Sequence, residues 1–244
     1  MPRLSRKRAA SGTSSASSPS SKMWNKNKKR ATSSGGSSSL SGINEAAAEK
    51  MFAEIADPDD PQTANMEGIF TLGEKLDIDA TEDIRILVLL WKMGVRDQPS
   101  QMSKQEWLQG CASLQADSWD KFRNTVLPSL DTGFLEQPDF KDFYKFCFTF
   151  SRQGTHKSLD KELTLALLKL VLSGDRIPKD RLDSFTSFLE ENSTYTHINL
   201  DQWTSFLDFC LEVQDLSNYD ESTSAWPVMI DEYVDFMEEL QKKK

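Results

Sequence analysis

Residues 83–92 read Asp-Ile-Arg-Ile-Leu-Val-Leu-Leu-Trp-Lys. This run predicts a helix that is apolar most of the way round, and such a helix belongs in the centre of a core. On both sides of it, large apolar residues recur at three- and four-residue spacing, which is the helical period. No segment sustains the two-residue alternation of a strand. The sequence therefore predicts a compact all-α domain with many short helices.

Local signals mark where these helices begin and end. Asn44 suits the cap of a first helix, which Pro58 and Pro61 terminate. Ser103-x-x-Glu106 and Asn199-x-x-Gln202 spell capping boxes, and the first of them opens a further helix. The other predicted helices cover residues 44–56, 68–76, 83–92, 119–130, 140–151, 159–173, 179–192, 200–213 and 226–240.

The charge of the chain divides it into two regions. Residues 1–42 carry nine Lys or Arg and no acid, and they contain almost no large apolar side chains. Such a composition predicts a disordered, Ser-rich basic tail. The whole chain holds 29 basic and 38 acidic residues, so residues 43–244 hold 20 against 38, a net charge of −18. We expect one ordered, strongly acidic domain behind a basic tail.

The tail carries two basic clusters of the kind that act as nuclear localisation signals. A solvated flexible tail is the alternative interpretation. We expect a nuclear protein that is also found in the cytoplasm, and no nucleic-acid partner, because the acidic domain would repel phosphate. No apolar run is long enough to span a bilayer, so we expect no membrane partner. The candidate signal residues are Arg6, Lys7, Arg8, Lys28, Lys29 and Arg30.

Metal and nucleophile motifs are weak. The best candidate for a calcium loop starts at Asp57, but it places Pro61 at position 5 and Gly68 at position 12, where a bidentate Glu is needed. His156 and His197 lie at no zinc-ligand spacing from a cysteine. Cys111, Cys147 and Cys210 are expected to be reduced core residues. We expect no metal, no cofactor and no catalytic residue, although a Cys–His pair assembled only in space is not testable from sequence.

The C-terminal segment is acidic and amphipathic. Pro227 suits the start of a helix. Met229, Tyr233, Phe236 and Leu240 then form an apolar face, and Asp231, Asp235 and Glu238 form an acidic one. Residues 201–239 hold eleven Asp or Glu and no Lys or Arg, which predicts a basic partner. Asp201 lies in a predicted first helical turn, where the helix dipole alone favours an acid.

Aromatic residues gather in 140–150, Phe-Lys-Asp-Phe-Tyr-Lys-Phe-Cys-Phe-Thr-Phe. Core packing explains most of them. A helix this apolar is also suited to wall a groove for a short hydrophobic peptide end.

Several strings together resemble the defective-in-cullin-neddylation family over about residues 46–238. The resemblance implies an all-α potentiating-neddylation domain at 43–244 with EF-hand-like halves that bind no calcium, at about 43–135 and 136–240. The matching strings are Ile-Leu-Val-Leu-Leu-Trp-Lys at 86–92, Ser-Lys-Gln-Glu-Trp at 103–107, Phe-Lys-Asp-Phe-Tyr at 140–144, Asp-Gln-Trp at 201–203, Ser-Asn-Tyr-Asp at 217–220 and Ala-Trp-Pro at 225–227.

The resemblance also implies a function. Such proteins are non-catalytic co-ligases, which hold the C-terminal winged-helix region of a cullin and the conjugating enzyme charged with the cullin modifier, alongside the RING subunit. Orienting the two reactants lowers the barrier without any reactive group of the scaffold. Nothing in the sequence indicates oligomerisation, and we expect a monomer. The alternative is an EF-hand-like calcium sensor or another nuclear interaction protein.

Two sites follow from the resemblance. The family's cullin-binding patch matches Asp201, Ala225 and Asp231. An apolar pocket for the acetylated N-terminal Met of the conjugating enzyme is the second site. Residues 94–102 are one residue longer than the family pattern and place Pro99 where relatives have a polar group, so the pocket rim differs. The pocket matches Ile69, Ile86, Leu89, Leu90, Met93, Met102, Phe150, Leu167 and Leu170.

Overall fold

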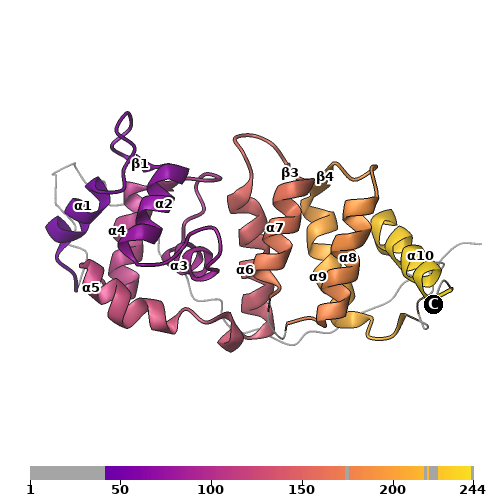
Figure 1. The fold of residues 1–244 in the computed structure, drawn as a ribbon. Helices are drawn as coiled ribbons and strands as arrows, with labels where there is room; N and C mark the ends of the chain where they lie inside the picture. The colour runs from indigo at the N-terminus through magenta and orange to yellow at the C-terminus, as the bar shows by residue number, and fades with distance from the viewer. Residues whose placement is uncertain (1–41, 174–175, 217–218, 220–224, 243–244) are drawn as a thin grey trace, which may run out of the picture. The chain divides into compact units, whose positions relative to one another are not determined.

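The computed structural model describes residues 42–173, 176–216, 219 and 225–242. The predicted tail and its six candidate signal residues lie outside them. The described residues from 42 onward belong to one compact unit, and they are mostly helical (Figure 1). The all-α prediction is confirmed. No described helix has the length and apolarity that a membrane span requires.

The N-terminal half begins with a capped helix. Asn44 Oδ1 accepts a hydrogen bond from Ala47 N, as the sequence predicted. Ser103 and Glu106 form the predicted capping box of α4. The elements of this half are α1 (Glu45–Ala53), β1 (Thr63–Ala64), α2 (Met66–Lys75), α3 (Arg85–Met93), β2 (Met102–Ser103) and α4 (Lys104–Leu114).

The single helix predicted over residues 119–130 is wrong in detail. The chain forms an α-turn, then a π-helical turn, then 3₁₀ turns. Pro128 lies where the π-helical turn gives way to the first 3₁₀ turn. Proline has no backbone N–H, so it cannot donate the hydrogen bond that would continue an α-helix. The segments are α5 (Trp119–Lys121), η1 (Phe122–Val126), η2 (Leu127–Ser129) and η3 (Thr132–Phe134).

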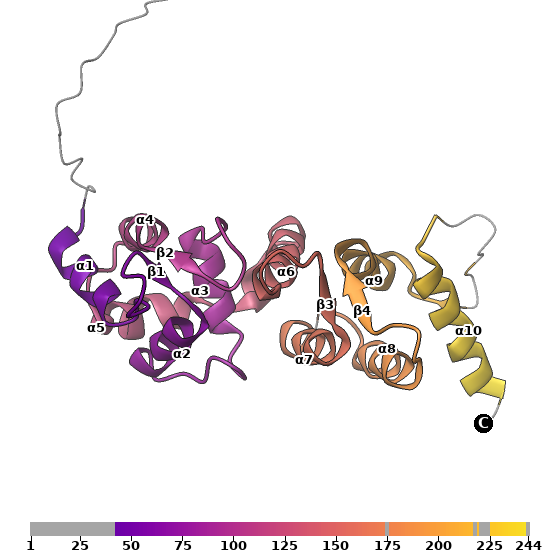
Figure 2. The ribbon, with the colours of Figure 1, turned by 90° about the horizontal axis from the view of Figure 1, so that it is seen from above.

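In the C-terminal half, α6 packs against α7 and α9, α7 packs against α8, and α10 packs against α8 and α9 (Figure 2). One predicted helix, 159–173, starts later than expected because its first residues form a strand and Asp160 caps the helix instead. The elements are α6 (Gln137–Ser151), β3 (Ser158–Asp160), α7 (Lys161–Val171), α8 (Lys179–Glu191), β4 (His197–Asn199), α9 (Leu200–Glu212) and α10 (Val228–Lys242).

Each half contains one short antiparallel ladder. β1 pairs with β2, with Ala64 opposite Met102, and β3 pairs with β4, with Leu159 opposite Ile198. In each ladder the strands lead into helices, α2 and α4 in the first half and α7 and α9 in the second. The resemblance implied two EF-hand-like halves at about 43–135 and 136–240, and that division stays a prediction.

The helix over residues 85–93 is central, as its composition predicted. Val88, Leu89 and Leu90 are fully buried. α3 contacts both α4 and α6, so it links the two halves. At this contact, Trp91 Nε1 donates to Asp142 Oδ2 at 2.7 Å, and Arg96 forms an ion pair with the same carboxylate at 2.9 Å.

Tyr144 of α6 and Trp203 of α9 join the two helices by ring stacking and by a hydrogen bond in each direction. The rings of Tyr144 and Trp203 stack with centroids 4.5 Å apart. The Tyr144 hydroxyl donates to the Trp203 carbonyl at 3.1 Å, and Trp203 Nε1 donates to the Tyr144 carbonyl at 3.0 Å. Both polar groups are therefore satisfied inside the core.

Candidate functional site

The three residues of the expected cullin-binding patch lie at or near the starts of two neighbouring helices. Asp201 is exposed in the first turn of α9. Ala225 is exposed and lies three residues before α10, and Asp231 is partly buried in the first turn of α10. α9 and α10 pack against each other. The capping box of Asn199 and Gln202 fixes the turn that carries Asp201.

The buried ring of Phe209 in α9 contacts two aromatic residues that precede α10. Tyr219 and Trp226 each lie edge-on to Phe209, at centroid distances of 5.7 and 5.8 Å. The Tyr219 hydroxyl donates a hydrogen bond to Asp231 Oδ1. Tyr219 therefore orients an acid of the patch. Its spacing in the sequence gave no sign of this role, because the contact depends on where Phe209 places the ring.

The two faces predicted for α10 are present, with one exception. Met229 and Tyr233 are buried and Phe236 is partly buried, but Leu240 is exposed. The Tyr233 hydroxyl lies 2.7 Å from Ser184 Oγ, and burial raises the pKa of Tyr233 to about 12. The tyrosine hence stays neutral and anchors α10 to α8.

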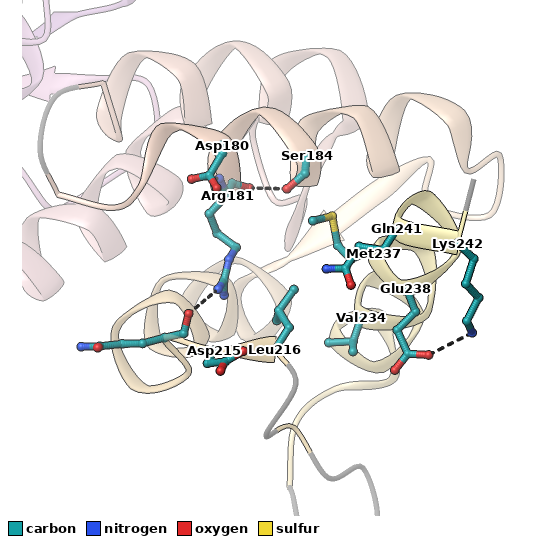
Figure 3. A pocket seen from close by; sticks show the side chains of 11 residues that line it. Asp180, Arg181, Ser184, Asp215, Leu216, Val234, Met237, Glu238, Gln241 and Lys242 are labelled. Atoms are coloured by element: carbon teal, nitrogen blue, oxygen red, sulfur yellow. Dashed lines mark hydrogen bonds and ion pairs between the residues drawn. The ribbon is translucent and has the colours of Figure 1, made fainter. Parts of the chain in front are cut away.

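A mixed groove of about 660 Å³ lies between α8, the residues that follow α9, and α10 (Figure 3). Leu216, Val234 and Met237 supply its apolar surface. Its basic residues already have partners: Arg181 donates to the Gln214 carbonyl at 3.2 Å, and Lys242 pairs with Glu238 at 3.3 Å. This groove holds acids and bases together, and its charge selects neither sign strongly.

The nine residues of the expected peptide pocket come from α2, α3, β2, α6 and α7. Contacts of α6 with α3 and with α7 connect three of these elements. Eight of the nine side chains are buried, and Leu170 is partly buried. All nine side chains are apolar, and eight of them belong to the core of the described structure rather than to an open surface.

A cavity of about 360 Å³ borders this set at Phe150. Its other walls include Arg96, Pro99 and Lys145, so it lies along the 94–102 loop. Ser100 fastens the loop to the end of α6 by donating from its backbone N to the Phe150 carbonyl at 2.7 Å. The 94–102 loop thus meets the apolar set at Phe150.

Glu106 fixes the other side of the same loop. One of its oxygens accepts from Arg96 N at 2.6 Å and Asp97 N at 2.8 Å. The other accepts from Ser103 N at 2.8 Å and Ser103 Oγ at 2.9 Å. The side chain is only 6% exposed. The sequence predicted the capping box, but not the two donors from the preceding loop.

The loop with calcium-like spacing is closed by its own hydrogen bonds. The Asp57 carboxylate accepts from Asp59 N at 2.9 Å and from Asn65 Nδ2 at 2.7 Å. Among the described residues, no three His, Cys, Asp or Glu side chains gather to hold a metal ion.

The cysteines have the character of core residues. Burial raises the pKa of Cys111 and Cys210 to about 12, and that of Cys147 well above its usual range. His156 and His197 are exposed. Since a thiolate is the nucleophilic form, these three thiols are unsuited to attack a substrate.

Comparison with known proteins finds a matching family model and several relatives. Residues 121–236 match the protein-family model described as cullin binding, which includes α6 to α9 and most of α10. The chain is 37% identical over 191 residues to human DCN1-like protein 4, covering 78% of this chain and 62% of that protein. It is 35% identical over 200 residues to the Drosophila melanogaster DCN1-like protein 4, covering 80% and 76%. It is 34% identical over 206 residues to human DCN1-like protein 5, covering 83% of each.

The helical fold and the family-model match together define an all-α protein with a cullin-binding domain in its C-terminal half. The resemblance inferred from the short strings is confirmed. The chain belongs to the DCN1-like family. It spans less than two thirds of the length of human DCN1-like protein 4.

Proposed function

We propose that this protein promotes cullin neddylation as a non-catalytic scaffold. The observation that carries the proposal is the match of residues 121–236 to the cullin-binding family model, combined with the exposed acids in that region. The scaffold holds a cullin and the modifier-charged conjugating enzyme beside the RING subunit. Its contribution to rate is proximity and orientation.

The cullin-binding patch comprises Asp201, Ala225 and Asp231. The two acids face basic residues of the cullin's C-terminal winged-helix region, and the small Ala225 permits close approach. The Tyr219 hydrogen bond supports this role, because an acid held in place before binding loses less entropy when it pairs.

The apolar set around α3 and α6 takes the acetylated N-terminal Met of the conjugating enzyme. Acetylation removes a positive charge that would be costly to bury against these side chains. Because Met93 and Met102 are buried in the described structure, they must shift to admit the ligand. Methionine is unbranched and adaptable, which suits it to that movement.

The basic tail directs the protein to the nucleus in this proposal. Deleting residues 1–42 is expected to change localisation, seen by microscopy of a tagged chain, and to leave cullin neddylation in a purified system unchanged.

The decisive experiment compares charge reversals in a cullin pull-down and in reconstituted neddylation. Asp201→Lys with Asp231→Lys is expected to abolish cullin binding and the stimulation of neddylation, while circular dichroism stays that of a folded helical protein. Glu74→Lys is the matched control, since Glu74 is exposed on α2, in the other half of the chain. Wild-type cullin affinity in the double variant would refute the proposed patch.

A further inference from the structure

One exposed apolar side chain stands out on α10. Val228, in the first turn of the helix, is 67% exposed. The other exposed large apolar side chains among the described residues are Met66, Phe70 and Leu240, at 39%, 43% and 37%. Val228 lies between Ala225 and Asp231 of the proposed patch. Its position calls for an explanation that the acidic residues alone do not supply.

The backbone around Val228 is firmly held. Trp226 packs edge-on against Phe209, and the Pro227 carbonyl accepts from Ile230 N at 2.7 Å. The next two residues, Met229 and Ile230, are buried. Helical geometry therefore directs Val228 outward while its neighbours point into the core. A partner that covers this side chain immobilises little that is not already fixed.

Acids follow Val228 along the same side of the helix. Residues three, four and seven positions later share a helical face, which here are Asp231, Glu232 and Asp235. Glu232 is oriented by the Tyr195 hydroxyl, which donates to its Oε2 at 2.7 Å. An apolar centre with a charged rim is the usual anatomy of a protein–protein interface.

The same row of acids continues into a second groove. This groove, of about 510 Å³, lies between the end of α8 and α10. Phe236, partly exposed and packed on the buried Phe188 with ring centroids 5.7 Å apart, provides the aromatic surface. Glu191, Glu232, Asp235 and Glu239 line it, and among the described residues no Lys or Arg does. In contrast to the mixed groove of Figure 3, its charge favours a cation strongly.

Aromatic surface and carboxylates together suit a long basic side chain. The hydrocarbon stem of Lys or Arg packs on rings while its charged head stays among acids and water. A small metal ion would use the carboxylates but not the rings. Continuity with Asp231 along α10 assigns this groove and the patch to one partner.

We infer that Val228 is the apolar anchor of the cullin-binding surface, and that the aromatic groove beside it receives a Lys or Arg side chain of the same cullin. This inference rests on the proposed function and extends the patch beyond Asp201, Ala225 and Asp231. It defines the complementary surface as an apolar spot next to a projecting basic residue.

The key variant is Val228→Glu, because it separates an apolar contact from charge attraction. An added acid would tighten binding of a basic partner if charge alone mattered. If Val228 is an apolar anchor, Val228→Glu should instead lower the cullin affinity by about tenfold or more, which is the order expected for one apolar side chain of this size. A Glu in the first helical turn is favoured by the helix dipole, so the fold is retained.

The assay is calorimetry of the full chain with a purified cullin C-terminal region. Val228→Thr, which is nearly identical in shape, should also bind the cullin more weakly than wild type, but by a smaller factor than Val228→Glu. Asp235→Lys should lower the cullin affinity by about tenfold, and Glu74→Lys should bind with the affinity of the wild type. Unchanged or tighter binding by Val228→Glu overturns the anchor, and an Asp235→Lys affinity equal to that of Glu74→Lys overturns the groove.

These failures differ from failure of the proposed function. If Asp231→Lys still abolishes binding while Val228→Glu does not weaken it, the scaffold function stands and the inference falls. If the wild-type chain binds no cullin, both fall.

Discussion

The buried carboxylate of Glu106 provides the sharpest test of how this fold is stabilised. Glu106→Ala removes the acceptor of four hydrogen bonds from Arg96 N, Asp97 N, Ser103 N and Ser103 Oγ. Each hydrogen bond to a charged group contributes roughly 1.5–3 kcal/mol, but donors that share an oxygen are not additive. We expect a loss of about 3–5 kcal/mol of unfolding free energy, against a total of about 5–15 kcal/mol for a typical domain.

Glu106→Gln gives a finer prediction. The amide keeps the volume of the side chain and one acceptor oxygen, which can still serve one pair of donors. Its NH₂ group then faces the other pair, donor against donor. We expect a loss of about 1–3 kcal/mol, the cost of leaving buried donors unpaired.

Urea denaturation followed by circular dichroism measures both changes. Gln105→Ala is the matched control, because Gln105 is exposed on the same turn of α4, and it should change stability by less than about 0.5 kcal/mol. If Glu106→Ala were no more destabilising than Gln105→Ala, the hydrogen bonds of Glu106 would not hold the loop and the argument would be wrong.

Two further predictions concern the helix junctions. Tyr219→Phe keeps the ring against Phe209 but removes the donor to Asp231, so cullin affinity should fall by about three- to tenfold with little change in thermal stability; equal affinity in a titration would show that the tether does not matter. The hydrogen bond from Trp91 and the charge of Arg96 lower the pKa of Asp142 below its ordinary value of 3.8. A lowered folded-state pKa adds stability that is present above pH 3.8 and is lost as the pH falls through the folded value, so Asp142→Asn should reduce stability at pH 7 and flatten its dependence on pH below about 4 in acid titrations.

Much of the helical framework was predictable because its signals are local. The apolar run at 86–91 placed the central helix, and the spellings at Ser103 and Asn199 placed two caps that the structure confirms. Each signal depends on residues within one or two helical turns. The positions of Asp201 and Asp231 near helix starts were predictable for the same reason.

Contacts between distant residues were not predictable in the same way. β3 and β4 are only three residues long each, too short to show periodicity, and they pair across a whole helix hairpin. The chain in 119–130 buries Phe122 and Val126 while it changes from α to π to 3₁₀ turns, and apolar spacing alone does not reveal such changes. The tether between Tyr219 and Asp231 requires the Phe209 ring, ten residues before Tyr219. Whether the nine apolar residues admit a peptide stays a prediction.

The support that Phe209 gives to Tyr219 and Trp226 has an evolutionary consequence. Because Tyr219 and Trp226 both pack on the Phe209 ring, contacts with α9 hold the chain on the N-terminal side of α10, where Asp231 lies. Lengthening a loop whose ends are already held costs little, about 0.6 kcal/mol for each doubling. Insertions or deletions between Tyr219 and Trp226 are therefore expected to leave the acid in place, so the length of this connection can change over generations while the helix that follows it is kept in register.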